Sequence, residues 1–342
     1  MAKSTPVTVS AGDQSYEWDD AWAKLPQTDA TRAAWPHHGV AVLPSAAIVT
    51  FHPAEPKLLV FDPDGSLYRT ADSEISDAHG FTVVQDGEAA YLWTADAAMK
   101  QAASAGYEPP ESSESSAVVK LALSGRVVMR LPKPELAVYQ SGQYRPTSVA
   151  VNEKRFNGNG DIWVADGYGE SYVHRFDASG RYVRSLSGEE GAGRFKGPHA
   201  LFIDRRHAEP ELYIADRNNA RIQVYDLEGR FRRVIGEGFL SRPTWFAVDG
   251  DRLLLLEFRP PRLTVLDAAD RLIGYIAENA DAPSREGWPN ELDDSGRPRR
   301  TTALEPGKLN SPHTLAVDRQ GNIYITEWLI GGRIIKLKKL PS

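Results

Sequence analysis

His199-Ala-Leu-Phe-Ile203 is followed by Leu212-Tyr-Ile-Ala-Asp216 and then by Arg221-Ile-Gln-Val-Tyr-Asp-Leu-Glu-Gly229. The first segment follows a Gly-Pro turn, the second ends in an acid, and the third alternates until it reaches a turn. Each is short, rich in β-branched and aromatic residues, and bounded by turn-forming residues, which is typical of β-strands. A fourth apolar stretch follows Gly229, so this region predicts four consecutive strands.

The same unit recurs along the whole chain. Its first strand is preceded, in chain order, by His38, His79, Thr147, His199, Thr244 and His313. Its second strand ends in an acid or a substitute for one, namely His52, Asp96, Asp166, Asp216, Glu257 and Glu327. Four short strands in a repeated unit of roughly 40 to 50 residues are typical of a β-propeller. We therefore expect an all-β, six-bladed propeller.

The sixth unit stops after its third strand, at Arg333-Ile-Ile-Lys-Leu-Lys-Lys-Leu340. A strand from the N-terminus, within residues 7–18, would complete that blade and close the ring without leaving an open sheet edge. We expect residues 1–20 to form an N-terminal tail that includes this closing strand, and residues 21–342 to form one propeller domain. Two long insertions, 100–116 and 280–310, interrupt blade two and precede His313.

The composition is that of a globular chain without an obvious polymeric partner. The 342 residues include 46 acidic and 40 basic side chains, a net charge of −6 spread without blocks, and no cysteine. This charge does not favour nucleic acid or an anionic membrane as partner, and the missing cysteines exclude disulfides and thiolate metal sites. The N-terminus has no sustained apolar segment, so we expect a cytoplasmic protein; its oligomeric state is not indicated.

The repeated histidine is the strongest functional signal. If the copies stand around a ring, copies two, four and six place His79, His199 and His313 symmetrically about one axis. Three neutral imidazoles can hold a divalent metal and leave one position open for water or substrate. His38 is an additional histidine at a repeat position, so a fourth ligand or a catalytic base remains open there.

Several motifs resemble those of NHL-repeat propellers, and specifically of the peptidyl-α-hydroxyglycine α-amidating lyase family. They are Tyr144-Arg-Pro-Thr-Ser-Val-Ala-Val151, Asp161-Ile-Trp-Val-Ala-Asp-Gly-Tyr168, Gly197-Pro-His-Ala-Leu201, Ala215-Asp-Arg-Asn-Asn-Ala-Arg-Ile-Gln223 and Ser311-Pro-His-Thr-Leu315. The resemblance covers residues 38–338. It implies zinc bound by the three histidines on alternate blades, a catalytic tyrosine at Tyr168 and a substrate-side arginine at Arg217.

The chain also departs from that family. The family's second active-site arginine follows a Phe-His pair in blade one, where this chain has Phe51-His52-Pro53. Arg145, or Arg242, is a candidate to supply the missing charge. The family's calcium ligand directly follows the last zinc histidine, where this chain has Thr314, so calcium is not expected.

These observations predict a metal-dependent, lyase-like enzyme that acts on a small hydroxylated substrate such as a carbinolamide. Zinc is the expected metal, with iron and manganese as alternatives. Two other functions remain open: a non-catalytic NHL-type interaction module, and a metal-dependent hydrolase or lactonase. We expect the strand-end aspartates to be structural, Trp93, Trp163 and Tyr213 to pack between blades, and His37, His174 and His207 to lie at the surface.

Overall fold

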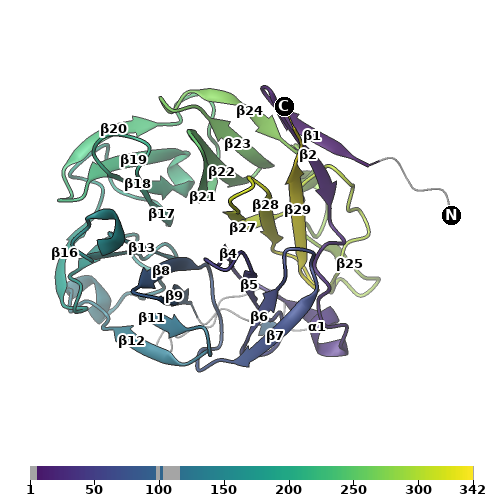
Figure 1. Ribbon diagram of the computed structural model, residues 1–342, viewed down its shortest axis with the longest axis horizontal. Helices are drawn as coiled ribbons and strands as arrows, with labels where there is room; N and C mark the ends of the chain where they lie inside the picture. The colour runs from purple at the N-terminus through teal and green to yellow at the C-terminus, as the bar shows by residue number, and fades with distance from the viewer. Residues whose placement is uncertain (1–5, 98–100, 103–115, 342) are drawn as a thin grey trace.

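Six sheets stand around a central axis, each ordered from the axis outward (Figure 1). The computed structural model describes residues 6–97, 101–102 and 116–341, and almost all regular structure in these ranges is β-strand. The expectation of a six-bladed, all-β propeller is therefore confirmed. Most of the insertion at 100–116 lies outside the described residues.

Blades one to five are four-stranded antiparallel sheets whose first strand is nearest the axis. Blades one and two contain β4 (Val40–Val42), β5 (Ile48–Phe51), β6 (Lys57–Phe61), β7 (Leu67–Asp72), then β8 (Thr82–Asp86), β9 (Ala89–Asp96), β11 (Ala117–Ala122) and β12 (Val127–Leu131). Blades three and four contain β13 (Ser148–Val151), β14 (Ile162–Ala165), β15 (Val173–Phe176), β16 (Tyr182–Leu186), then β17 (Pro198–Asp204), β18 (Glu211–Asp216), β19 (Arg221–Asp226) and β20 (Phe231–Ile235). Blade five contains β21 (Pro243–Asp249), β22 (Arg252–Phe258), β23 (Pro261–Leu266) and β24 (Leu272–Ile276).

Blade six joins the two ends of the chain. Its strands, from the axis outward, are β27 (Pro312–Val317), β28 (Ile323–Glu327), β29 (Arg333–Lys339), β2 (Gln14–Asp19) and β1 (Thr8–Ala11). Trp18 pairs with Leu337, so the purple N-terminal strand lies beside the yellow C-terminal strand in Figure 1. Ring closure by an N-terminal strand is confirmed, and the same segment supplies a second, outer strand.

Turns of the pattern Asp-x-x-Gly fix the hairpin between the third and fourth strands of blades one, three and four. In blade four, the Gly229 N–H donates to the Asp226 carbonyl at 2.9 Å, and Gly229 has φ +79°. Glycine adopts this left-handed conformation without the steric cost that a Cβ atom brings. In blade five Asp270 takes the equivalent position with φ +61°, which aspartate tolerates better than most residues.

Apolar residues fill the space between neighbouring blades rather than one central core. Trp93 belongs to the cluster between blades two and three, Trp163 to the cluster between blades three and four, and Tyr213 to the cluster that joins blades four to six. All three side chains are almost fully buried, so the expectation that they pack between blades is confirmed. This packing holds the first strands of all blades around one axis.

A short segment before the first repeat crosses one end of the ring. It consists of α1 (Asp29–Ala33) and β3 (Ala34–Trp35), and β3 pairs with β10 (Gln101–Ala102). The insertion before blade six contains η5 (Ala282–Ser284), β25 (Glu291–Leu292) and β26 (Pro298–Arg299), while the remaining short helices are η2 (Ala137–Gln140), η3 (Lys154–Phe156) and η4 (Arg217–Asn219). Over the described residues, no helix has the length and apolar character needed to cross a membrane.

Candidate metal centre

The repeat position at the start of the first strand is set by a local irregularity of the sheet. In blade six, Pro312 pairs with Glu327 and Thr314 pairs with Thr326, so His313 is one extra residue in the inner strand. Blades four and five show a register shift at the equivalent point. Such a bulge redirects the side chain of the extra residue. This explains how the start of an edge strand can present its side chain to the axis.

Each of the three predicted metal ligands contacts the next blade in the same way. Its Nδ1 atom lies against the main-chain carbonyl at the repeat position of that blade: His79 at 2.6 Å from Thr147, His199 at 2.9 Å from Thr244, and His313 at 3.1 Å from His38. A carbonyl oxygen can only accept, so each Nδ1 carries the proton and each Nε2 retains its lone pair. Even-numbered blades thus supply imidazoles, and odd-numbered blades fix their tautomer.

The three rings lie together at the axis. Ring centroids are 4.8 Å apart for His79 and His199, 4.5 Å for His79 and His313, and 5.8 Å for His199 and His313. All three side chains are buried, and burial lowers the pKa of each well below the usual histidine value, to about 3 for His313. The histidines are therefore neutral at neutral pH and can act as metal ligands.

Tyr168 places its hydroxyl among these nitrogens. The oxygen lies 3.1 Å from Nε2 of His79 and 2.9 Å from Nε2 of His199. The tyrosine follows β14, and its N–H donates to the Arg145 carbonyl at 3.2 Å, which holds the turn in place. Burial raises the pKa of the Tyr168 phenol, and the nearby Arg217 cation lowers it in part.

His37 also belongs to this cluster, and our expectation that it lies at the surface is wrong. Its side chain is buried, and its Nε2 atom lies 3.2 Å from the Tyr168 hydroxyl. One potential ligand atom each from His37, His79 and His313 can be chosen so that all three lie within 4.8 Å of one another. This set differs from the predicted triad by having His37 in place of His199. The sequence reasoning missed His37 because it lies outside the repeat, directly before the frame position His38.

The donor set at the axis fits a cation. Nε2 of His79 lies 3.1 Å from Nε2 of His313, and both atoms carry lone pairs because both Nδ1 atoms donate to carbonyls. The single phenolic proton of Tyr168 can satisfy only one of the nitrogens around it. A divalent metal that prefers imidazole, such as zinc or iron, would satisfy this excess of lone pairs.

His38 contributes to the centre through its backbone. Its carbonyl accepts from Nδ1 of His313 and from the Thr326 hydroxyl, both at 3.1 Å. Its ring is buried near the loop between β28 and β29, where a Cβ atom on Gly332 would come within 3.4 Å of Cε1 of His38. The ring is thus not among the group of ligand atoms that the structure brings together.

The candidate arginines are placed differently from one another. Arg217 begins η4, and its guanidinium carbon lies 5.3 Å from the centre of the Tyr168 ring. Its Nε atom is buried and has no hydrogen-bond partner among the described residues. Arg145 is almost fully buried beside Tyr168, and burial lowers the pKa of its guanidinium. The side chain of Arg242 is exposed at the surface.

An aromatic group borders His37. Trp328 stacks on Trp35 with ring centroids 5.0 Å apart, and it lies 6.2 Å from the His37 ring. Phe258 contacts both Trp328, at 5.8 Å, and Trp288, at 4.8 Å. Trp288, Trp328 and Phe258 are partly exposed, so they offer an apolar surface next to the histidines.

The strand-end acids are structural, as expected. Asp166 accepts from the N–H groups of Arg145 and Glu170, both at 2.7 Å, and Asp216 accepts from the Lys196 N–H at 2.8 Å. Each aspartate, at the end of the second strand of its blade, therefore holds the segment that leads into the first strand.

His174 was expected at the surface, and this is wrong. The side chain is fully buried in the middle of blade three, where it contacts the Tyr139 hydroxyl at 2.8 Å and the Ser185 hydroxyl at 2.7 Å. His207 is partly exposed, with 32% of its side chain accessible. It stands beside Asp204 and Asp270 in a second group that could hold a metal, but Arg206 already binds both carboxylates at 2.7 Å.

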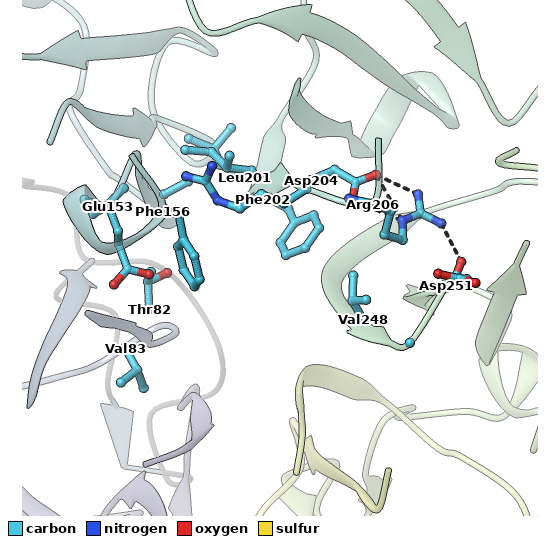
Figure 2. A pocket seen from close by; sticks show the side chains of 15 residues that line it. Thr82, Val83, Glu153, Phe156, Leu201, Phe202, Asp204, Arg206, Val248 and Asp251 are labelled. Atoms are coloured by element: carbon cyan, nitrogen blue, oxygen red, sulfur yellow. Dashed lines mark hydrogen bonds and ion pairs between the residues drawn. The ribbon is translucent and has the colours of Figure 1, made fainter. Parts of the chain in front are cut away.

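A cavity of about 560 Å³ lies away from the histidines (Figure 2). It is lined by residues that follow the repeat position along the first strands, such as Val83, Leu201 and Val248, so it opens at the other end of the axis. Phe156 and Phe202 form apolar walls, while Arg206 is held by Asp204 and by the Asp251 carbonyl. This cavity is thus not at the cluster of titratable groups.

Comparison with known proteins gives relatives of two kinds. The chain is 30% identical over 196 residues to peptidyl-glycine alpha-amidating monooxygenase A of Xenopus laevis, a match that covers 53% of this chain and 18% of the frog protein. It is 29% identical over 262 residues to peptidyl-alpha-hydroxyglycine alpha-amidating lyase 2 of Drosophila melanogaster, covering 73% of this chain and 51% of the fly protein. It is 24% identical over 282 residues to human NHL repeat-containing protein 3, covering 80% and 70% of the two chains.

No family model matches the sequence. Among solved structures, a streptogramin B lyase matches with a TM-score of 0.56 and 13% identity, over 97% of this chain and all of that one, which supports the propeller fold alone. The chain thus spans less than a fifth of the length of the frog relative and about half of the fly lyase. The predicted resemblance to amidating lyases and NHL proteins is confirmed.

Proposed function

We propose that this protein is a metal-dependent lyase that cleaves a small carbinolamide, or a similar hydroxylated compound, at the axial histidines. One observation carries the proposal: three imidazoles from alternate blades, each fixed in one tautomer by the next blade, lie together at the axis, and two of them contact the hydroxyl of one tyrosine. A binding module has no need for this arrangement. A lactonase of the propeller type would be expected to use carboxylate and amide ligands instead.

His79, His199 and His313 would hold the metal, with zinc as the expected ion and iron or manganese as alternatives. Bound to neutral imidazoles, a divalent ion keeps its full charge and can polarise a substrate oxygen or favour the ionised form of a nearby phenol. Calcium is not expected. The Thr314 hydroxyl that replaces the family's calcium ligand contacts the Thr326 hydroxyl at 2.8 Å instead.

Tyr168 would act as the base. Its oxygen stands where a substrate hydroxyl would meet the histidines, and the Arg217 cation works against the effect of burial on its pKa. The phenolate takes the proton of the substrate hydroxyl, the oxygen forms a carbonyl, and the bond between the same carbon and the amide nitrogen breaks. The nitrogen leaves with the bonding electron pair and takes up a proton, so the products are an amide and an aldehyde.

Arg217 would bind the acidic end of the substrate. Its buried Nε has no partner in the part of the chain that the structure describes, which is costly for a guanidinium unless a ligand supplies an acceptor. Arg145 would supply the second positive charge that blade one lacks, and the ring of His38 remains a candidate for a supporting role. The aromatic group of Trp288, Trp328 and Phe258 suits the apolar part of a small substrate better than an extended peptide.

Elemental analysis of protein purified without added metal, followed by an assay with N-acyl-α-hydroxyglycines, tests the proposal. We expect about one divalent ion per chain and release of glyoxylate together with the acyl amide. Tyr168→Phe is the matched control, because it removes one oxygen and leaves the ligands in place. Protein that binds no metal at the axis would point to the interaction module, and cleavage of lactones without glyoxylate release would point to the hydrolase.

A further inference from the structure

We propose that His37 is a fourth imidazole ligand of the metal, supplied by the segment that precedes the first repeat. The inference rests on the proposed metal centre and goes beyond it, because neither the repeat nor the resemblance assigns His37 a role. It changes the expected coordination: the position that three histidines leave open is occupied in the substrate-free protein.

The His37 ring lies as close to the rings of His79 and His313 as the repeat histidines lie to one another. Its ring centroid is 4.2 Å from that of His313 and 4.4 Å from that of His79, closer than the 5.8 Å that separates His199 from His313. Its Nε2 lies 3.2 Å from the Tyr168 oxygen, which is also 2.9 Å from Nε2 of His199 and 3.1 Å from that of His79. Nitrogens from four imidazoles thus surround one small volume at the axis.

The segment that carries His37 is held firmly. The Gly331 N–H donates to the Ala34 carbonyl at 2.7 Å, and Ala34 and Trp35 pair with β10. Trp35 stacks on Trp328 at an interplanar angle of 29°. The two partners of this segment, β10 and Trp328, both lie outside the first blade. A buried imidazole delivered on such a scaffold is pre-positioned for a ligand rather than folded in by chance.

His37 also meets the other potential ligand atoms directly. One ligand atom each from His37, His79 and His313 lie within 4.8 Å of one another, and all three side chains are buried. Metal binding through Nε2 uses the His37 tautomer that is protonated at Nδ1, and Nε2 is the ring atom that faces Tyr168. A metal ion would then accept lone pairs from all four rings together.

Cobalt(II)-substituted protein offers a direct count of the ligands. Proton NMR of such protein shows strongly shifted signals from the N–H groups of metal-bound imidazoles, and we expect four of them in the unaltered protein. His37→Ala should remove one signal and speed metal loss to a chelator by about tenfold or more. His207→Ala, which removes a partly exposed histidine away from the axis, should leave four signals and an unchanged release rate.

Chemical rescue separates ligation from a structural role. His37→Gly leaves a space beside the metal, and added imidazole should restore the fourth signal and slow the release of cobalt. Three signals in the unaltered protein, or the same count and release rate in His37→Ala, would overturn the inference. Cobalt binding that survives His79→Ala unchanged would instead remove the metal centre itself. If His37→Ala does not fold, the count on the unaltered protein still decides.

Discussion

The two ends of the propeller axis are built from the same six strands but satisfy their polar groups in opposite ways. At the end seen in Figure 2, Arg206 meets the carboxylates of Asp204 and Asp270, so charge is balanced within the protein. At the other end, His79 and His313 face each other with lone pairs at 3.1 Å. The end with the cavity therefore balances its own charges, and the end with unmet acceptors is where we expect a ligand to bind.

The largest expected effect is loss of the metal from the histidine end alone. His79→Ala removes a ligand that sits between His313 and Tyr168, so metal content should fall by at least an order of magnitude and turnover should disappear. Phe202→Ala, in the cavity at the opposite end, should keep full metal content. Elemental analysis of both variants checks this, and equal metal loss in the two would break the distinction between the ends.

Tyr168→Phe should have the next largest effect. The change removes one oxygen and little volume, so the metal should stay bound while turnover falls by about 10²–10⁴-fold through loss of the proton-transfer group. Steady-state kinetics with parallel metal analysis is the measurement. A rate equal to that of the unaltered protein would remove the tyrosine from the mechanism and leave the metal centre untouched.

Arg217→Lys should act mainly on binding. Lysine keeps the charge but cannot offer two parallel N–H groups to a carboxylate, so KM for an acidic substrate should rise by about tenfold with a smaller change in kcat. Arg205→Lys, at the rim of the other cavity, is the matched control and should leave KM unchanged. A dominant loss in kcat for Arg217→Lys would show that the guanidinium acts on the reacting atoms.

The smallest effect concerns acid stability of the metal-free protein. The folded-state pKa of His199 is lowered by burial, so the unfolded chain binds more protons below about pH 6.5, and stability falls as the pH drops from there. The pKa of Asp204 is lowered in the folded protein, so its contribution to stability is lost only at lower pH, as the pH falls through the folded-state pKa of this carboxyl. The free energy of unfolding, measured with urea between pH 6.5 and 4.5, should fall less steeply with decreasing pH in His199→Gln. The difference in slope should be at most ~1.4 kcal/mol per pH unit. Identical slopes would contradict a neutral, buried His199.

The repeat made most of the fold predictable. Strand patterns with fixed turn residues indicated the six blades, and the missing fourth strand of the last copy indicated closure by residues 7–18. The same repeat predicted that His79, His199 and His313 occupy equivalent positions in alternate blades. Their shared contact to the next blade follows from the repeat geometry, and Tyr168 and Arg217 were assigned through the motifs around them.

Residues outside the frame were predictable only in part. His37 directly follows Trp35 and Pro36. The large apolar side chain of Trp35 was the one feature of the sequence here that indicated a buried segment. The repeat instead predicted a role for the ring of His38. In the structure it is the His38 carbonyl, and not the ring, that contacts the axial histidines. The prediction for His174 was wrong because β15 is the third of the four strands in its blade, and both faces of this strand are covered. In such a strand, alternation of apolar and polar residues does not distinguish buried from exposed side chains.

Closure of the ring by β2 sets the order in which the protein can be completed during synthesis. Gln14 contacts the carbonyl of Leu340, a separation of 326 residues, and the contact between His79 and His313 spans 234. The first strand to leave the ribosome must therefore wait for the last one, at a considerable cost in loop entropy. The proposed metal site also needs this late part of the chain, because His313 must meet His79. We therefore expect a metal ion to bind to a nearly complete ring rather than to nucleate its folding.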